Sequence, residues 1–411
     1  MHVPRAVTHF ESCLPNNRDP SFFHPFPPGR FEPYRHDRRP ASHRAPSIAS
    51  ASSRAPEHVP LPLTATRSRR WDRRTAPPDA GSKPTSPLTM FVDAGSVTIN
   101  DRPTALGRTS LTPREDILGA IRKYTDPFRV TKGKDFRLKD FDPGDTLGLK
   151  MDKEEAAGLL RRGSDWLAME QDILYAQDSW SLLLVFQAMD AAGKDGTIKH
   201  VLSPVNPQGC EVHSFKQPSD EELSHDFLWR YATKAPQRGR IGIFNRSYFE
   251  EVLVVRVHQD LLRAQKLPPK LVGKDIWDER LDEIARFEDY LARQGVVILK
   301  FYLNLSKKEQ KKRFMERLDK PEKNWKFSAS DVRERRYWDD YMEAYEEAIR
   351  ATATKAAPWF VVPADNKWFT RLVVVAAIVE AVERLDLKYP KVSPEQKKDL
   401  AAARAELEAG S

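Results

Sequence analysis

Beyond residue 150 the chain alternates between short apolar runs and longer amphipathic segments. An unbroken apolar run occurs at 182–186, largely apolar runs occur at 241–244, 296–303 and 359–362, and a mixed segment at 211–215 has extended character. An apolar run of this length between turn residues is typical of a buried strand. We therefore predict five strands at these positions.

Segments with helical spacing lie between the predicted strands. In residues 153–177, Leu159, Leu160, Leu167 and Leu174 fit one helical face. Ser219 has the character of a helix cap, with acidic residues in the turn that follows. Helices are predicted at 114–124, 153–177, 219–232, 275–294, 306–318, 331–351 and 367–385, with a loop at 132–146 that turns at Pro143 and Gly144.

This alternation of strands and helices predicts an α/β fold. Its sheet should be mainly parallel and covered by helices on both faces, in three layers α/β/α. In such sheets ligands collect beyond the carboxyl ends of the strands. Three candidate sites follow such ends: residues 188–194, Lys216 and residues 245–247.

Composition separates the N-terminal segment from the rest. Residues 1–90 contain 16 of the 31 prolines and 14 Lys/Arg against 7 Asp/Glu, so they carry +7 of the formal net charge of +8. Without a sustained apolar period, this segment is predicted to be a disordered basic tail. Two further interpretations are an organellar transit peptide, which the prolines disfavour, and an upstream start, with Met90 as the true first residue. A protein that starts at Met90 is expected to fold and to keep its activity.

Cysteine content and hydropathy bear on the compartment. The chain has 2 cysteines, Cys13 and Cys210, too few for a disulfide framework, and a reducing compartment is expected. The longest apolar run, 372–379, is too short to span a membrane, and no secretory signal is visible. We therefore expect a soluble cytoplasmic protein with no membrane partner. Residues 110–388 are predicted to form the catalytic domain, and residues 389–411 a polar C-terminal tail.

The loop after the first predicted strand has features of a phosphate-binding loop. Such a loop needs small residues whose N–H groups can face an anion, a helix N-terminus behind it and a lysine at its rim. The segment from Ala188 to Lys194 has this spacing, with Gly193 in the second glycine position. An alanine occupies the first glycine position, so a positive φ is not expected there, and Asp195 stands where a magnesium-binding Ser or Thr normally follows the lysine. The alternative is a tight β–α turn with a solvated lysine.

Acidic residues near this loop suggest a metal ion. Asp190 lies inside the loop and Asp195 directly follows its lysine, and both would repel a phosphate unless a hard cation such as Mg²⁺ stood between them. Alternatively, Asp190 is a carboxylate that caps the following helix. The position where kinases carry a second carboxylate is occupied by Asn245, a neutral amide. Either Glu250 or Glu251 could compensate, or both could be exposed helix carboxylates.

Basic residues are concentrated in one segment. Residues 307–336 hold 12 Lys/Arg against 6 Asp/Glu. A solvated helical face is the ordinary explanation of such a run, but residues 319–326 are expected to form a loop between helices, where kinases carry a mobile lid. Further positive charge is expected from Lys216, Arg230, Arg240 and Arg246. This amount of cationic side chain suits a polyanion longer than a triphosphate.

Five motifs in order resemble the polyphosphate kinase 2 family. They are AMDAAGKDG from Ala188, SFKQPS from Ser214, HDFLWR from His225, FNRSYFEEVL from Phe244 and RLDKPEKNWKFSASD from Arg317. The resemblance extends over residues 111–385. It implies a P-loop kinase fold with a helical lid at about 306–336, and Mg²⁺-dependent transfer of a phosphoryl group between inorganic polyphosphate and a nucleotide.

The resemblance also implies roles for single residues. Asp190 would bind the metal and orient the acceptor phosphate, Lys194 would hold the transferred group, and Arg246 would contact phosphate. Nucleotide or phosphate contacts are implied for Ala191, Ala192, Gly193, Asp195, Gly196, Asn245 and Glu250. Polyphosphate contacts are implied for Lys216, Arg230, Arg313, Arg317, Lys323 and Lys326.

The same resemblance sets the expected partners. They are polyphosphate and AMP, ADP or ATP, with guanine nucleotides as further candidates, and a homo-oligomer that is a dimer or a tetramer. The Asn245-Arg246-Ser247 variant with Glu250 resembles the subgroup associated with AMP as well as ADP. No nucleic acid partner is expected. Two alternatives stay open: an ATP-dependent nucleotide or nucleoside kinase, and a non-catalytic polyanion- or RNA-binding protein.

Overall fold

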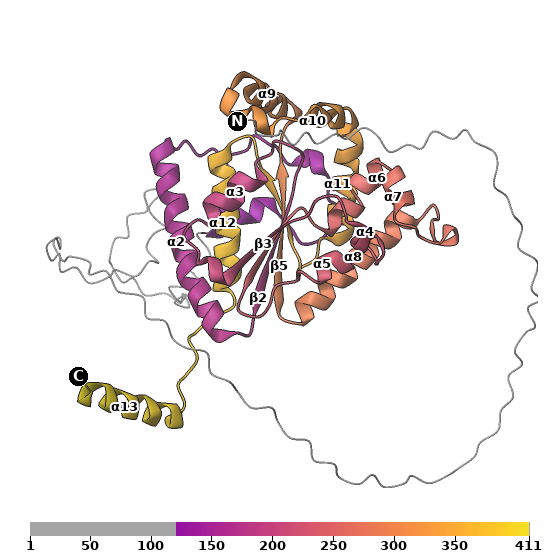
Figure 1. Cartoon of the computed structure of the whole chain (residues 1–411). Coiled ribbons are helices and arrows are strands. Elements are labelled where there is room, and N and C mark those ends of the chain that lie inside the picture. Colours follow the sequence, from indigo (N-terminus) through magenta and orange to yellow (C-terminus); the bar gives the residue numbers. More distant parts are fainter. Residues whose placement is uncertain (1–120, 411) are drawn as a thin grey trace, which may run out of the picture. The chain divides into compact units, whose positions relative to one another are not determined.

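The computed structural model describes residues 121–410. The expected tail at 1–90, with Cys13 and Met90, lies outside the described residues, as does most of the predicted helix at 114–124. Residues 121–125 of that helix are helical. Figure 1 shows the whole chain, coloured along the sequence where it is described.

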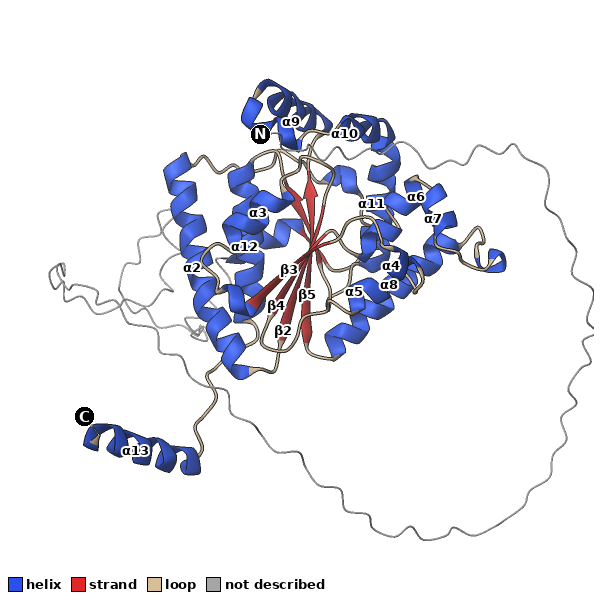
Figure 2. Ribbon diagram, in the orientation of Figure 1, coloured by secondary structure: helices blue, strands red, loops and turns tan. Residues whose placement is uncertain are grey.

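The strands form one sheet at the centre of the described part (Figure 2). Its order is β1-β6-β5-β2-β4-β3, and all neighbours are parallel except β1, which pairs antiparallel with β6. The prediction of a mainly parallel sheet is confirmed. β1 was not predicted, because 2 residues are too few to show a period. The strands are β1 (Arg129–Val130), β2 (Ser181–Gln187), β3 (Cys210–Ser214), β4 (Ile241–Asn245), β5 (Val296–Asn304) and β6 (Trp359–Pro363).

Helices cover both faces of the sheet (Figure 1). α2 (Lys153–Gln177), α3 (Lys194–Val201) and α12 (Lys367–Glu383) lie on one face, and α8 (Ile276–Arg293) and α11 (Trp338–Thr352) lie on the other. Along β2, Leu182 and Leu184 belong to the first apolar core, whereas Leu183 belongs to the second. Burial on both faces explains why this strand is an unbroken apolar run rather than an alternating one.

Two of the predicted helices are interrupted in the structure. The segment predicted as one helix at 219–232 forms α4 (Asp220–Leu223) and α5 (Trp229–Ala232). The carboxylate of Asp226 accepts the backbone N–H groups of Leu228 (2.9 Å) and Trp229 (3.1 Å) and so begins a new helix. The segment predicted at 331–351 divides into α10 (Ala329–Glu334), the 3₁₀ turn η8 (Arg335–Tyr337) and α11.

Residues 306–336 lie over the carboxyl edge of the sheet in Figure 1. They begin with α9 (Lys307–Asp319), whose cap Ser306 accepts the backbone N–H of Glu309 at 3.0 Å. The 3₁₀ segment η7 (Pro321–Lys326) follows, and then α10 and η8. The segment that the sequence suggested as a lid is therefore mostly helical.

The remaining helices were not predicted, because most are too short to show a period. They are η2 (Asp126–Phe128), η3 (Leu138–Asp140), η4 (Pro207–Gly209), η5 (Tyr248–Glu251), α6 (Val254–Val257), α7 (Asp260–Ala264), η6 (Pro269–Leu271) and α13 (Pro394–Ala409). α13 lies in the expected polar tail; it starts with a capping box on Ser393 and buries none of its residues. Within residues 121–410, no helix has the length and apolar character needed to cross a membrane.

Candidate active site

The loop between β2 and α3 turns tightly, with two residues in left-handed backbone conformations. Gly193 caps α3 with a φ of 106°, a left-handed value that glycine adopts without strain. Ala191 also has a positive φ, of 63°. Ala188 is not among the described residues with positive φ, as expected for an alanine in that place. Ala192, within the loop, is buried, and Gly196 lies in the first turn of α3.

The lysine of the loop reaches back across it. Lys194 Nζ donates a hydrogen bond to the carbonyl oxygen of Ala188 at 2.8 Å. Burial lowers the pKa of Lys194, and the positive charge of Arg246 lowers it further. A bound anion would favour the charged amine, so a phosphate suits the place beside Lys194 and Arg246.

Arg246 brings the neighbouring strand end into the same site. It directly follows β4, the parallel neighbour of β2. Its guanidinium lies 3.2 Å from a carboxylate oxygen of Glu250 and 3.7 Å from one of Asp190. The charge of Glu250 is the main reason why the pKa of Arg246 is raised. Asp190, Lys194, Arg246 and Glu250 therefore lie together, as the sequence predicted for parallel strand ends.

Asn245 and Asp195 also meet at this edge. The amide nitrogen of Asn245 donates to Oδ1 of Asp195 at 2.7 Å. A carboxylate in the place of Asn245 would face another carboxylate, so the neutral amide removes a like-charge contact. Glu251 is turned away: it is buried against Arg280, with oxygen and nitrogen 3.1 Å apart. Of the two glutamates that could compensate for Asn245, only Glu250 reaches the site.

Asn245→Asp should make the rate sensitive to pH. Two carboxylates at this distance raise the pKa of one, so the pair carries a single charge in acid and a second one as the pH rises. We expect the variant to match the parent near pH 5 and to be about threefold slower near pH 8, because the added negative charge opposes phosphate binding. A rate–pH profile measures this. Asn245→Ala, which adds no charge, should keep a constant ratio to the parent, and a flat ratio for Asn245→Asp would contradict the contact.

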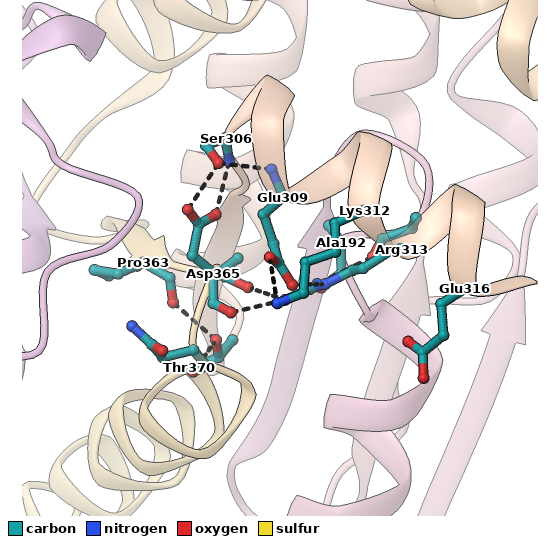
Figure 3. A network of polar contacts seen from close by, with 12 residues as sticks. Ala192, Ser306, Glu309, Lys312, Arg313, Glu316, Pro363, Asp365 and Thr370 are labelled. Atoms are coloured by element: carbon teal, nitrogen blue, oxygen red, sulfur yellow. Dashed lines mark hydrogen bonds and ion pairs between the residues drawn. The ribbon is translucent and has the colours of Figure 1, made fainter.

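Arg313 is the principal difference from the sequence-based site. The sequence predicted that it binds polyphosphate, but it is buried, at 5% exposure, and faces protein carbonyls (Figure 3). Its Nη1 donates to Ala191 O (3.1 Å) and Ala192 O (2.8 Å), and its Nη2 to Ala364 O (2.7 Å) and Asp365 O (3.0 Å). Nε donates to Glu309 at 3.0 Å, so all five N–H groups of the guanidinium are used. In this conformation Arg313 has no donor left for a substrate; instead it joins the loop after β2 to the segment after β6.

A second contact joins α9 to the phosphate loop. Gln310 Nε2 donates to the backbone oxygen of Asp190 at 3.0 Å, and Arg335 donates to the Gln310 side chain at 2.7 Å. The first half of α9 is therefore attached to the loop. A lid motion that preserves these bonds must begin beyond Arg313.

The other three cations of this segment that were predicted to bind polyphosphate have partners within the protein. Arg317 lies 3.3 Å from Asp331, and Lys323 donates to Glu316 at 2.7 Å. Lys320 also donates to Glu316, and the two lysines lower the pKa of this carboxyl to about 2. Lys326 lies over the ring of its exposed neighbour Trp325, 4.9 Å from the centroid. The lysine pairs lie at the surface, where exchange for a phosphate costs little, whereas Arg317 and Asp331 are half-buried.

The basic residues near β3 and β4 have different surroundings. Lys216 is exposed just after β3, at the carboxyl edge. Arg230, predicted to bind polyphosphate, is 7% exposed; it donates to Lys216 O at 2.9 Å and lies over the ring of Phe215. Arg240 precedes β4 and so lies at the opposite edge of the sheet, away from the loop. Arg230 therefore supports the segment that carries Lys216, and Arg240 is not part of the site.

Sequence reasoning did not single out Asp331, whose carboxylate lies 3.3 Å from Arg317. Burial raises the pKa of its carboxyl, and the nearby charge of Asp190 raises it further. The last motif of the family resemblance ends on Asp331, which was the available signal. Among residues 121–410 no group of three or more His, Cys, Asp or Glu side chains is arranged to hold a metal ion.

The fold and the site together indicate the class of enzyme. The site consists of the loop, the helix behind it and the cations at adjacent strand ends. A mainly parallel α/β sheet with such a loop after a central strand is the arrangement of a kinase-type phosphotransferase.

The comparisons with known proteins identify the family. The family model for polyphosphate kinase 2 matches residues 150–390. The chain belongs to the polyphosphate kinase 2 family. The expected family and the expected phosphotransferase class are both confirmed.

Named relatives and a solved structure agree with this. An ADP-polyphosphate phosphotransferase of Rhodopseudomonas palustris is 50% identical over 284 residues, covering 69% of this chain and 98% of the relative. An AMP/ADP-polyphosphate phosphotransferase of Meiothermus ruber is 45% identical over 264 residues, covering 64% and 95%. The crystal structure of polyphosphate kinase 2 from Arthrobacter aurescens superposes with a TM-score of 0.61 at 40% identity, covering 68% of this chain and 96% of the other. These names do not favour an ATP-dependent kinase or a non-catalytic binding protein.

Proposed function

We propose that the protein transfers a phosphoryl group reversibly between inorganic polyphosphate and a nucleotide, with ADP and AMP as acceptors and Mg²⁺ as the metal. The observation that carries the proposal is the meeting of Asp190, Lys194 and Arg246 at one loop. The names of the relatives support the pair of substrates, since one is called an ADP and another an AMP/ADP phosphotransferase.

Phosphoryl transfer requires the protein to position the substrates and to place positive charge near the transferred group. Phosphoryl transfer passes through a loose transition state whose charge is spread over the equatorial oxygens. Lys194 is already placed at the loop, and exchanging its bond with Ala188 O for a phosphate oxygen would put its charge on the transferred group. Arg246 would contact the same group from the strand beside it. Because the bonds broken and formed are both phosphoanhydrides, concentrations should set the direction.

The carboxylates suit a divalent ion between the two substrates. Asp190 lies in the loop itself, and Glu250 faces the same guanidinium as Asp190. When bound, Mg²⁺ would neutralise charge between donor and acceptor oxygens. Asp190 would be its protein ligand, with substrate oxygens and water completing the coordination.

One incubation tests the proposed function. The protein is mixed with Mg²⁺, long-chain polyphosphate and either ADP or AMP, and nucleotides are separated by chromatography. We expect ATP from ADP, and ADP from AMP. Absence of both products, together with phosphorylation of AMP by ATP alone, would replace the proposal by a conventional nucleotide kinase. Rates with AMP, ADP, GMP and GDP measured side by side define the acceptor.

Asp190→Asn tests the metal ligand. Losing the negative charge weakens metal binding, so we expect the Mg²⁺ concentration for half-maximal rate to rise about tenfold. A magnesium titration at saturating substrates measures it. Asp172→Asn, an exposed carboxylate on α2, serves as the control and should leave the titration unchanged. Equal requirements in the Asp190 variant and the parent would remove Asp190 as a ligand.

A further inference from the structure

Two cations that no motif singled out lie next to the phosphate loop. Lys367 and Arg371 belong to the first turns of α12, which follows β6 at the same edge of the sheet as the loop after β2. Arg313 bonds both to Ala192 O in that loop and to Asp365 O just before α12 (Figure 3). The guanidinium of Arg313 thus connects the loop directly to the start of α12.

Further contacts place these cations beside α3 and the loop. A Cβ added to Gly196, in the first turn of α3, would lie 3.9 Å from a guanidinium nitrogen of Arg371. Burial lowers the pKa of Lys367, and the charges of Arg313 and Lys323 lower it further, although the more distant carboxylates of Glu316 and Glu309 oppose this. Positive charge therefore converges on the space between α12, α3 and α9.

Two cations that face this space form no ion pair. Within residues 121–410 neither Lys367 nor Arg371 has a carboxylate within ion-pair distance. The carboxylate nearest in sequence, Asp365, already has partners. Its oxygens accept hydrogen bonds from the backbone N–H of Ser306 at 2.8 Å and from the Ser306 hydroxyl at 2.7 Å. Thr370, whose hydroxyl donates to Pro363 O at 2.8 Å, secures the turn that carries both cations.

The two sides of the loop therefore differ in charge. On the β4 side, Arg246 is accompanied by the carboxylates of Asp190 and Glu250. On the α12 side, the carboxylates of Glu316 and Glu309 act on Lys367 from beyond ion-pair distance, and neither Lys367 nor Arg371 forms an ion pair within residues 121–410. In-line transfer brings donor and acceptor to the phosphoryl group from opposite directions. A nucleotide that shares a metal with carboxylates suits the β4 side, whereas a polymer with a charge on every unit suits the side of unpaired cations.

We propose that Lys367 and Arg371 form a second phosphate-binding position, which holds the polyphosphate chain beyond the unit at Lys194. This inference rests on the proposed function. It assigns polyphosphate, rather than the phosphates of the nucleotide, to the α12 side of the loop.

Steady-state kinetics of Lys367→Ala and Arg371→Ala test the assignment. For long-chain polyphosphate we expect KM to rise about tenfold in each variant, the effect of losing one charged hydrogen bond. The slope of log KM against log salt concentration should fall by roughly one for each phosphate that the variant no longer neutralises. KM for ADP should not change, and kcat/KM for tripolyphosphate should fall less, because a short chain ends before this position. Lys367→Arg keeps the charge and should restore most of the affinity.

The matched control is Lys355→Ala. Lys355 is also exposed but precedes β6, at the opposite edge of the sheet, and its replacement should alter none of these constants. Parental KM values for polyphosphate in both α12 variants would overturn the inference, and so would a rise in KM for ADP alone. Equal losses of kcat/KM with tripolyphosphate and with long chains would also contradict the inference, because they would mean that the two side chains act on the transferred phosphoryl unit and not on the chain beyond it. If the parent protein makes no ATP from polyphosphate, the proposed function itself fails. That result is distinct from a failure of this inference, in which the parent protein is active and the variants keep its KM.

Discussion

Replacing Lys194 by alanine is expected to lower turnover by ~10²-fold or more, the scale seen when one group that stabilises developing charge is removed. The amine lies at the loop, within 2.8 Å of Ala188 O, in surroundings that already lower its pKa. Alanine leaves the phosphoryl oxygens facing the loop without this charge. Turnover at saturating polyphosphate, ADP and Mg²⁺ measures the loss.

The control for this variant lies on the same helix. Lys199 is exposed on α3 away from the loop, and Lys199→Ala should retain turnover. Binding of polyphosphate to the Lys194 variant should largely persist, because other cations remain. Unchanged turnover in Lys194→Ala would exclude this loop as the active site, while parental binding with no turnover in either protein would restore the non-catalytic alternative.

Strand ends were the predictable part of the site. The run 182–186 is apolar throughout because β2 is buried on both faces, so the pattern alone marked the central strand. Parallel strands end at one edge, and this geometry brings Asp190 and Arg246 together although 56 positions separate them. Residues that immediately follow such strands can be assigned to one site without a structure.

Side chains on covering helices could not be assigned in this way. A sequence shows that a residue is cationic but not which atoms it faces. Arg313 and Arg317 are one turn apart on α9, yet the first is buried among carbonyls and the second forms a half-buried pair with Asp331. Lys367 and Arg371 were overlooked for the opposite reason: they lie on a largely apolar helix, where no charge run marks them.

A variant of Arg313 can distinguish a role in supporting the loop from a role in binding polyphosphate. Arg313→Met leaves the oxygens of Ala192 and Asp365 without their donor, and buried acceptors left unpaired cost about 1–3 kcal/mol each. We expect a loss of about 3 kcal/mol in the free energy of unfolding, since some carbonyls will find water. Because the loop would lose its support, kcat should fall more than tenfold, with a small change in KM for polyphosphate.

A role in binding polyphosphate, as the sequence suggested, requires the reverse: KM for polyphosphate rises while stability and kcat stay near the parent. Denaturant unfolding and steady-state kinetics on one preparation distinguish the two. Lys312→Met is the matched control, because the preceding residue on α9 is 78% exposed and pairs only with Glu309, at 3.3 Å. Its replacement should cost less than about 0.5 kcal/mol. A stable Arg313 variant with impaired polyphosphate affinity would mean that the guanidinium leaves its carbonyls when substrate binds, and that the first half of α9 moves after all.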